Sequence, residues 1–148
     1  PDAGARAALP ARIVESLQAL AGFGLLPPGA DDAPGRISTW ATLADVVDGA
    51  SYVQECAPED LELKRALFAE LDRLAPPEAV LASATSALPA SRFAQGLPGA
   101  ARCLVAHPGN PPYLLRVIEL VPAPFTAPAS VERAAAMLRD AGLEPVHV

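Results

Sequence analysis

Two side chains at the ends of apolar segments have types that suit proton transfer. His107 ends the run "CLVAH", and Glu119 lies inside the run "RVIELV". A carboxylate in an apolar strand is costly to bury without a partner, and a histidine on a neighbouring strand would supply that partner. A carboxylate held against an imidazole orients the ring and raises its basicity. The pair therefore predicts a general base for an alcohol proton, although a single histidine at a strand end more often has a structural role.

More polar residues follow the other strand-like segments of the chain. Glu59 comes after "YVQEC", Thr85 and Ser86 come after "VLAS", and Asn110 comes after "CLVAH". In open α/β sheets, ligands bind beyond the carboxyl ends of the strands. We therefore expect these side chains to gather at one edge of the sheet and to form a ligand site there.

The elements that must position these residues alternate between strands and helices along the chain. Apolar runs predict strands at 51–56, 79–84, 102–107, 116–121 and 144–148, with a further short strand at 36–40. Helical spacing of apolar residues predicts helices at 5–21, 58–77 and 130–142, with shorter ones at 43–49 and 88–95. This alternation predicts an α/β fold with a parallel sheet and flanking helices.

The two clearest helices after residue 50 each carry an apolar stripe. In the first, the stripe predicts burial of Leu63, Ala66, Leu67, Leu71 and Leu74. In the second, it predicts burial of Val131, Ala134, Ala135 and Leu138. Taken by its position alone, Lys64 is an ordinary solvated charge on the exposed side of the first helix. Pro76 and Gly142 are the expected stop signals.

Composition and charge exclude several classes of protein. The chain has 148 residues, 51% of them hydrophobic and 19% charged, which is typical of one globular domain. The net charge of −6 offers no basic surface for nucleic acid, and no apolar run is long enough to cross a membrane. The two cysteines, Cys56 and Cys103, have no metal-site or disulfide spacing, so we expect two buried thiols in a reducing cytoplasm and no metal.

Three segments of the chain match a known pattern: "VQECAPEDLELKRALFAELD", "SATSAL" and "AHPGNPPYLLRVIELVPAP". Together they resemble the NAD-binding domain of the 3-hydroxyacyl-CoA dehydrogenase family. The His-Pro-x-Asn-Pro-Pro form is most similar to the branch that includes λ-crystallin and L-gulonate 3-dehydrogenase. Ser86, His107 and Glu119 are separated by 21 residues (86 to 107) and 12 residues (107 to 119), as in the family pattern. The resemblance covers about 51–148 specifically and implies a partial, doubly wound Rossmann-like sheet.

The resemblance also implies an activity and roles for these residues. His107 would be the general base on a substrate hydroxyl, Glu119 would orient it, Ser86 would bind the substrate oxygen, and NAD would accept the hydride. It implies cofactor contacts by Glu59, Lys64, Ser86 and Asn110. It implies a small-molecule substrate, either a 3-hydroxyacyl-CoA or a small 3-hydroxy acid such as L-gulonate, and a homodimer for the intact protein. Ala84 stands where the family has asparagine.

Two parts of the family's architecture have no counterpart in the sequence. The Gly-x-Gly-x-x-Gly unit that holds the pyrophosphate is missing, since "GFGLLP" at 22–27 follows a helix and lacks the third glycine. The helical domain expected after residue 148 is missing too. We therefore expect residues 1–148 to be a partial NAD-binding domain that is inactive alone. A non-catalytic, crystallin-like protein is the alternative from a different class.

Overall fold

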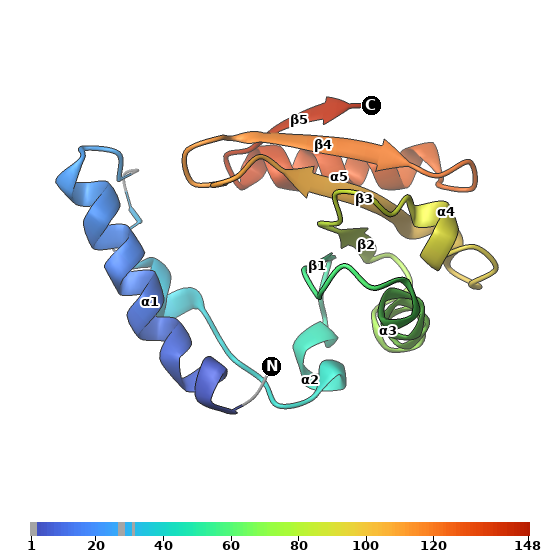
Figure 1. Cartoon of the computed structure of the whole chain (residues 1–148), viewed down its shortest axis with the longest axis horizontal. Coiled ribbons are helices and arrows are strands. Elements are labelled where there is room, and N and C mark those ends of the chain that lie inside the picture. Colours follow the sequence, from blue (N-terminus) through green and yellow to red (C-terminus); the bar gives the residue numbers. More distant parts are fainter. Residues whose placement is uncertain (1–2, 27–28, 31) are drawn as a thin grey trace. The chain divides into compact units, whose positions relative to one another are not determined.

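The computed structural model describes residues 3–26, 29–30 and 32–148. The chain forms two compact units, which comprise residues 1–46 and 47–148. The second unit contains the whole sheet (Figure 1). All the site residues predicted above also fall within its residue range.

A five-stranded sheet, with strand order β1-β2-β3-β4-β5, is the centre of the second unit. The strands are β1 (Tyr52–Glu55), β2 (Val80–Ser83), β3 (Cys103–Pro108), β4 (Val117–Pro122) and β5 (Glu144–His147). All neighbours are parallel except β3 and β4, which are antiparallel. The predicted α/β class with a mostly parallel sheet is confirmed. The antiparallel pair departs from it because the short connection 109–116 contains no crossover helix, so the chain turns back at once.

Helices cover both faces of this sheet. They are α3 (Leu61–Leu74), α4 (Ala90–Phe93) and α5 (Pro128–Asp140), with a 3₁₀ turn η2 (Ala100–Arg102) before β3. α3 begins where the Asp60 carboxylate accepts a hydrogen bond from the Leu63 amide at 2.8 Å, an N-cap contact that favours this start. α5 ends before Gly142, whose φ of +82° suits glycine and stops the helix.

α5 forms the main core with one face of the sheet. Its buried side chains are Val131, Ala134, Ala135 and Leu138, as predicted. They pack against Val80, Ala82, Leu104, Ala106, Ile118 and Leu120, which alternate along β2, β3 and β4. Figure 1 shows α5 running alongside β3 and β4.

The other face of the sheet packs against α3 and α4, and here the predicted stripe is partly wrong. Leu71 is buried as expected, but Leu63 and Ala66 are exposed. Phe68 and Lys64 take the buried positions instead, and the Phe68 ring lies 4.4 Å from that of Phe93, centroid to centroid. The buried face of α3 is rotated because an ion pair and an aromatic contact, neither visible in the apolar periodicity, fix its orientation.

The first unit contains α1 (Ala3–Gly22) and the 3₁₀ turn η1 (Ala33–Arg36). The long predicted helix is confirmed, and Gly24 follows it with a φ of +66°. The predicted strand at 36–40 is wrong: Ile37–Trp40 has no strand partner in the described chain, and Ile37 and Trp40 are exposed. The short helix α2 (Leu43–Val47) forms where it was expected, before Gly49.

The two cysteines differ in burial, which corrects the expectation of two buried thiols. Cys103 is buried in β3, and burial raises the pKa of its thiol to about 12. Cys56 follows β1 and is exposed. Among the helices that the structure describes, none combines the length and the hydropathy required to cross a bilayer.

Candidate active site

The site lies at the carboxyl-terminal edge of β1, β2 and β3. These strands are parallel, so the segments that follow β1 and β2 leave the sheet at the same edge as His107 near the end of β3. β4 returns antiparallel, and its register makes Glu119 the direct cross-strand partner of His107. Opposite residues on antiparallel strands have side chains on the same face, which explains why these two meet.

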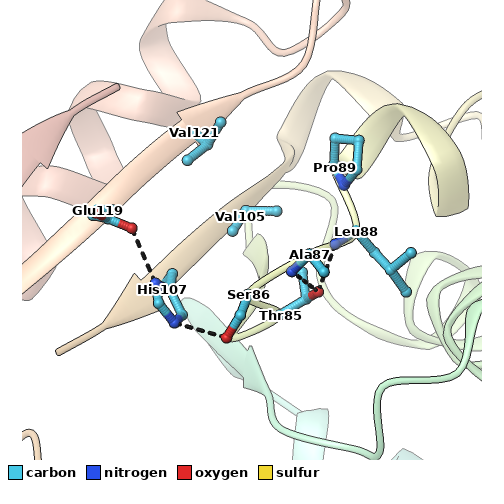
Figure 2. A pocket seen from close by; sticks show the side chains of 9 residues that line it. All are labelled: Thr85, Ser86, Ala87, Leu88, Pro89, Val105, His107, Glu119 and Val121. Atoms are coloured by element: carbon cyan, nitrogen blue, oxygen red, sulfur yellow. Dashed lines mark hydrogen bonds and ion pairs between the residues drawn. The ribbon is translucent and has the colours of Figure 1, made fainter. Parts of the chain in front are cut away.

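Ser86, His107 and Glu119 form one chain of hydrogen bonds (Figure 2). The Ser86 Oγ lies 2.9 Å from His107 Nε2, and His107 Nδ1 lies 3.0 Å from Glu119 Oε2. An ionised carboxylate can only accept, so Nδ1 carries the proton and Nε2 of the neutral ring is left as an acceptor. The network therefore selects the tautomer whose Nε2 can take a proton.

This network of hydrogen bonds is open to solvent, which corrects the expectation that Glu119 is buried in an apolar strand. The prediction that Glu119 pairs with a histidine on a neighbouring strand is confirmed. However, the Glu119 side chain is 51% exposed and that of His107 is 29% exposed, so the carboxylate is not buried. β4 alternates between exposed and buried residues, and only the face that carries Ile118 and Leu120 is covered. Proton exchange with a bound molecule is therefore sterically accessible.

A groove of about 210 Å³ lies beside this hydrogen-bonded chain. It is lined by the turn after β2 and by β3 and β4, through Thr85, Ser86, Ala87, Leu88, Pro89, Val105, His107, Glu119 and Val121. Figure 2 shows Val105 and Val121 on the neighbouring strands, with Leu88 and Pro89 across from them. The groove thus places an apolar surface next to one hydroxyl, one imidazole and one carboxylate.

Among the residues predicted to contact the cofactor, Glu59 is hydrogen-bonded to the turn that contains Ser86. Its Oε1 accepts hydrogen bonds from the Thr85 hydroxyl and from the Ala87 amide, the latter at 3.1 Å. The Thr85 hydroxyl is the main cause of the lowered pKa of this carboxyl. Burial opposes it as the second-largest effect, and the Ala87 amide, Lys64 and His107 each lower the pKa further. Asn110 is exposed in the turn between β3 and β4, and the structure describes no side-chain hydrogen bond for it.

Lys64 is buried, so the interpretation as a solvated surface charge is wrong. Its side chain is 1% exposed, and its Nζ lies 3.0 Å from both oxygens of Glu55. It also lies 3.8 Å from Glu59 Oε2. The contact of Lys64 with a cofactor stays a prediction.

Sequence reasoning placed Thr85 at this edge but missed Glu55 and Ser83, and all three are buried there. Glu55 ends β1, and its Oε2 accepts a hydrogen bond from the Ser83 hydroxyl at 2.5 Å. The signal was present in "YVQEC": a carboxylate in an apolar strand needs a partner, and Lys64 follows nine residues later on the next helix. The argument applied to Glu119 fits Glu55 better.

Comparison with known proteins shows which family the chain resembles. The family described as the NAD-binding domain of 3-hydroxyacyl-CoA dehydrogenase matches residues 2–148. The chain is 48% identical to a λ-crystallin homolog of Bos taurus over 120 residues, which cover 81% of this chain and 37% of that protein. It is 38% identical to an L-carnitine dehydrogenase of Pseudomonas putida, over 100% of this chain and 45% of that protein. The chain thus spans less than half the length of these relatives.

Solved structures give the same result. FadB2 of M. tuberculosis superposes with a TM-score of 0.90 at 32% identity, covering 100% of this chain and 53% of that one. The 3-hydroxybutyryl-CoA dehydrogenase of Escherichia coli superposes with a TM-score of 0.90 at 26% identity, over 99% of this chain and 31% of that one. The sheet and its helices are therefore Rossmann-like.

Proposed function

The chain belongs to the 3-hydroxyacyl-CoA dehydrogenase family, as part of its NAD-binding domain, and from this premise we propose that it supplies the proton-transfer centre of an NAD-dependent dehydrogenase. The reaction is oxidation of a 3-hydroxy group to a ketone. The observation that carries the proposal is the hydrogen-bonded chain from Ser86 through His107 to Glu119.

His107 acts as the general base. Its Nε2 is the acceptor end of an imidazole whose other nitrogen is held by Glu119. When the substrate carbon loses its hydride, the hydroxyl proton moves to Nε2, and the nearby carboxylate stabilises the resulting imidazolium. A positioned base of this kind contributes about 10²–10⁴-fold to the rate.

Ser86 positions the substrate oxygen. Its hydroxyl already lies at hydrogen-bond distance from Nε2. A substrate hydroxyl between Ser86 and His107 would accept a hydrogen bond from Ser86 while donating its own proton to Nε2. The serine is then a fixed donor towards the oxygen on which negative charge develops.

The residues present fit the nicotinamide half of NAD, which accepts the hydride when it is bound. Glu59 Oε1 is engaged by Thr85 and Ala87, whereas the nearest cation to Oε2 is Lys64 at 3.8 Å within the described chain. That oxygen remains able to accept a hydroxyl, such as those of a ribose. We propose that Glu59, Ser86 and Asn110 contact the cofactor, with Lys64 contributing its charge next to Glu59.

Acyl transfer, the other chemistry that a Ser-His-Glu arrangement suggests, is disfavoured. Serine hydrolases commonly stabilise the oxyanion with the backbone amide that follows the nucleophile. The corresponding amide here, that of Ala87, already donates to Glu59 and to Thr85. The amide that would be needed is therefore engaged by acceptors of the protein itself.

The substrate class is a 3-hydroxyacyl-CoA or a small 3-hydroxy acid. The test is NADH formation, followed by absorbance, by the complete gene product that contains these 148 residues. The substrates are 3-hydroxybutyryl-CoA, L-carnitine and L-gulonate, each against a control without substrate. The proposal predicts saturable NADH formation with at least one of them. A folded protein that reduces NAD with none of them would instead support the non-catalytic, crystallin-like alternative.

A further inference from the structure

Two opposite charges are buried together beneath the proposed active site. Glu55 at the end of β1 and Lys64 on α3 form an ion pair whose side chains are 2% and 1% exposed. Removing two charges from water is costly, and an apolar pair of similar volume is often as stable or more stable. Neither side chain opens into the groove beside His107. Packing alone does not explain why charges occupy these positions, so their contacts must be considered.

Glu55 joins three segments of chain at one point. Its Oε1 accepts the Ala57 amide at 2.5 Å, which fixes the start of the segment that leads to Glu59. Both carboxylate oxygens accept from Lys64, which ties in α3. Its Oε2 accepts from the Ser83 hydroxyl, which ties in the end of β2. A single buried carboxylate thus sets the positions of both segments that leave the sheet at this edge.

The segments that follow β1 and β2 make a second set of contacts, which hold the residues on either side of Ser86. The residue before it, Thr85, donates its amide to Ser83 Oγ at 3.3 Å and its hydroxyl to Glu59 Oε1. The residue after it, Ala87, donates its amide to the same Glu59 oxygen at 3.1 Å. Ser86 is therefore held from both sides while its own hydroxyl is directed to His107.

We propose that Glu55, Lys64, Ser83 and Thr85 act, together with Glu59, as positioning residues that hold Ser86 at hydrogen-bond distance from His107 Nε2. Lys64 is central because its ammonium lies between two carboxylates, 3.0 Å from Glu55 and 3.8 Å from Glu59. Hydrogen bonds between charged groups have a preferred direction and so fix the orientation of both partners. An apolar pair would not fix that orientation. The catalytic meaning of this inference rests on the proposed function, but the geometry that it predicts does not.

The test follows the imidazole of His107 by ¹⁵N NMR in the 148-residue chain, without cofactor or substrate. The chain has two histidines, His107 and His147, so a His147→Gln variant assigns the signals. The Nε2 resonance reports whether the ring nitrogen accepts a hydrogen bond from Ser86, and Ser86→Ala defines its position when that bond is lost.

Two variants disturb the positioning residues in different ways. Thr85→Val removes the bracketing hydroxyl and keeps the shape of the side chain. Glu55→Gln with Lys64→Met removes both buried charges at once, which avoids leaving one of them without a partner. We expect each to move the Nε2 resonance towards its position in Ser86→Ala, with the larger shift in the double variant.

The matched control is another buried ion pair among the residues that the structure describes. Arg102 and Asp72 are joined at 2.9 Å with side chains 10% and 6% exposed, and neither lines the groove. Asp72→Asn with Arg102→Met should leave the Nε2 resonance unchanged.

The inference is overturned if folded Thr85→Val keeps the wild-type resonance, or if the control shifts it equally. Circular dichroism verifies folding, and if the charge-free double variant unfolds, Thr85→Val alone decides. Because no turnover is measured, failure here is distinct from failure of the proposed dehydrogenase activity.

Discussion

Two side-chain pairs at the carboxyl-terminal edge of the sheet, Glu55–Lys64 and His107–Glu119, differ in what surrounds them. Glu55 and Lys64 are buried and surrounded by donors and acceptors of the protein, whereas His107 and Glu119 face solvent beside a groove. A buried pair cannot exchange protons with a bound molecule, but it fixes the backbone around it. An exposed pair does little for stability, but it can react. The same edge of the sheet thus carries one pair that fixes the backbone, Glu55–Lys64, and another that can transfer a proton, His107–Glu119.

The pair Arg102–Asp72 is also buried, but it lies away from the site, so it shows what a buried ion pair does where it does not position site residues. Its guanidinium also binds the backbone oxygens of Asp72, Pro76 and Ala79, and so fastens the end of α3 to the turn before β3. This pair contributes to stability at the amino-terminal end of β3, away from the site residues.

The largest change in stability is expected when Lys64 alone is replaced. Lys64→Met leaves Glu55 buried without its cation, and breaking a buried pair in this way costs about 3–5 kcal/mol of unfolding free energy. Urea unfolding followed by circular dichroism measures it. The charge-free double variant, Glu55→Gln with Lys64→Met, should recover a large part of the loss. Equal destabilisation by both would mean that packing, and not charge, holds this region.

The exposed pair should respond in the opposite way. Glu119→Gln removes the acceptor that selects the Nδ1–H tautomer, so we expect NADH formation by the complete gene product to fall about 10²-fold or more. The unfolding free energy should change by no more than about 0.5 kcal/mol, as for other exposed substitutions. Steady-state kinetics and urea unfolding on the same preparation check both. A large loss of stability with unchanged kcat would reverse the roles of the two pairs.

A smaller effect is expected at Glu59, which connects the two regions. The Thr85 hydroxyl is the main cause of its lowered pKa, so Thr85→Val should raise that pKa. Because the folded-state pKa lies below the unfolded value, this group stabilises the fold above the unfolded pKa, and the contribution is lost as the pH falls through the folded pKa. Carboxyl ¹³C NMR titration of both proteins measures the shift. An unchanged pKa would show that Thr85 does not hold Glu59.

The smallest expected effect uses Cys56 as a reporter of the buried pair. Partial desolvation raises the pKa of this thiol although the residue is exposed at the surface; Glu55 raises the pKa further, and Lys64 lowers it. Glu55→Gln should therefore lower the thiol pKa and accelerate alkylation by iodoacetamide by a few-fold at neutral pH. Mass spectrometry locates the label, with buried Cys103 as the internal control. A slower reaction in this variant would contradict the electrostatic account.

Local patterns in the sequence predicted much of the fold. The face of α5, the five strands of the sheet and the stop at Gly142 all follow from spacing and from backbone preferences of single residues. The antiparallel turn between β3 and β4 did not follow, and neither did the lack of a strand partner for 37–40 within the described residues, because pairing depends on which strands are neighbours in space. The face of α3 was rotated because Lys64, a charged residue, takes a core position.

The site residues also differ in how far the sequence predicted them. The contact between His107 and Glu119 was predictable because a carboxylate on one strand and a histidine on the next suggested a pair. Ser86 was predictable from the spacing that the family resemblance supplied. The buried role of Glu55 was missed although its apolar strand carried the signal, because the sequence did not indicate which of the two carboxylates, Glu55 or Glu119, would face an ammonium and which would face solvent.

The most direct test of the central claim is the rate of NADH formation by the complete gene product with His107→Gln. The account predicts a loss of about 10²–10⁴-fold in kcat, because the base is removed, with an unfolding free energy close to that of the wild type, because the side chain is partly exposed. A variant that turns over within a few-fold of the wild-type rate would contradict it, and the edge that carries Ser86, His107 and Glu119 would not be the reactive centre.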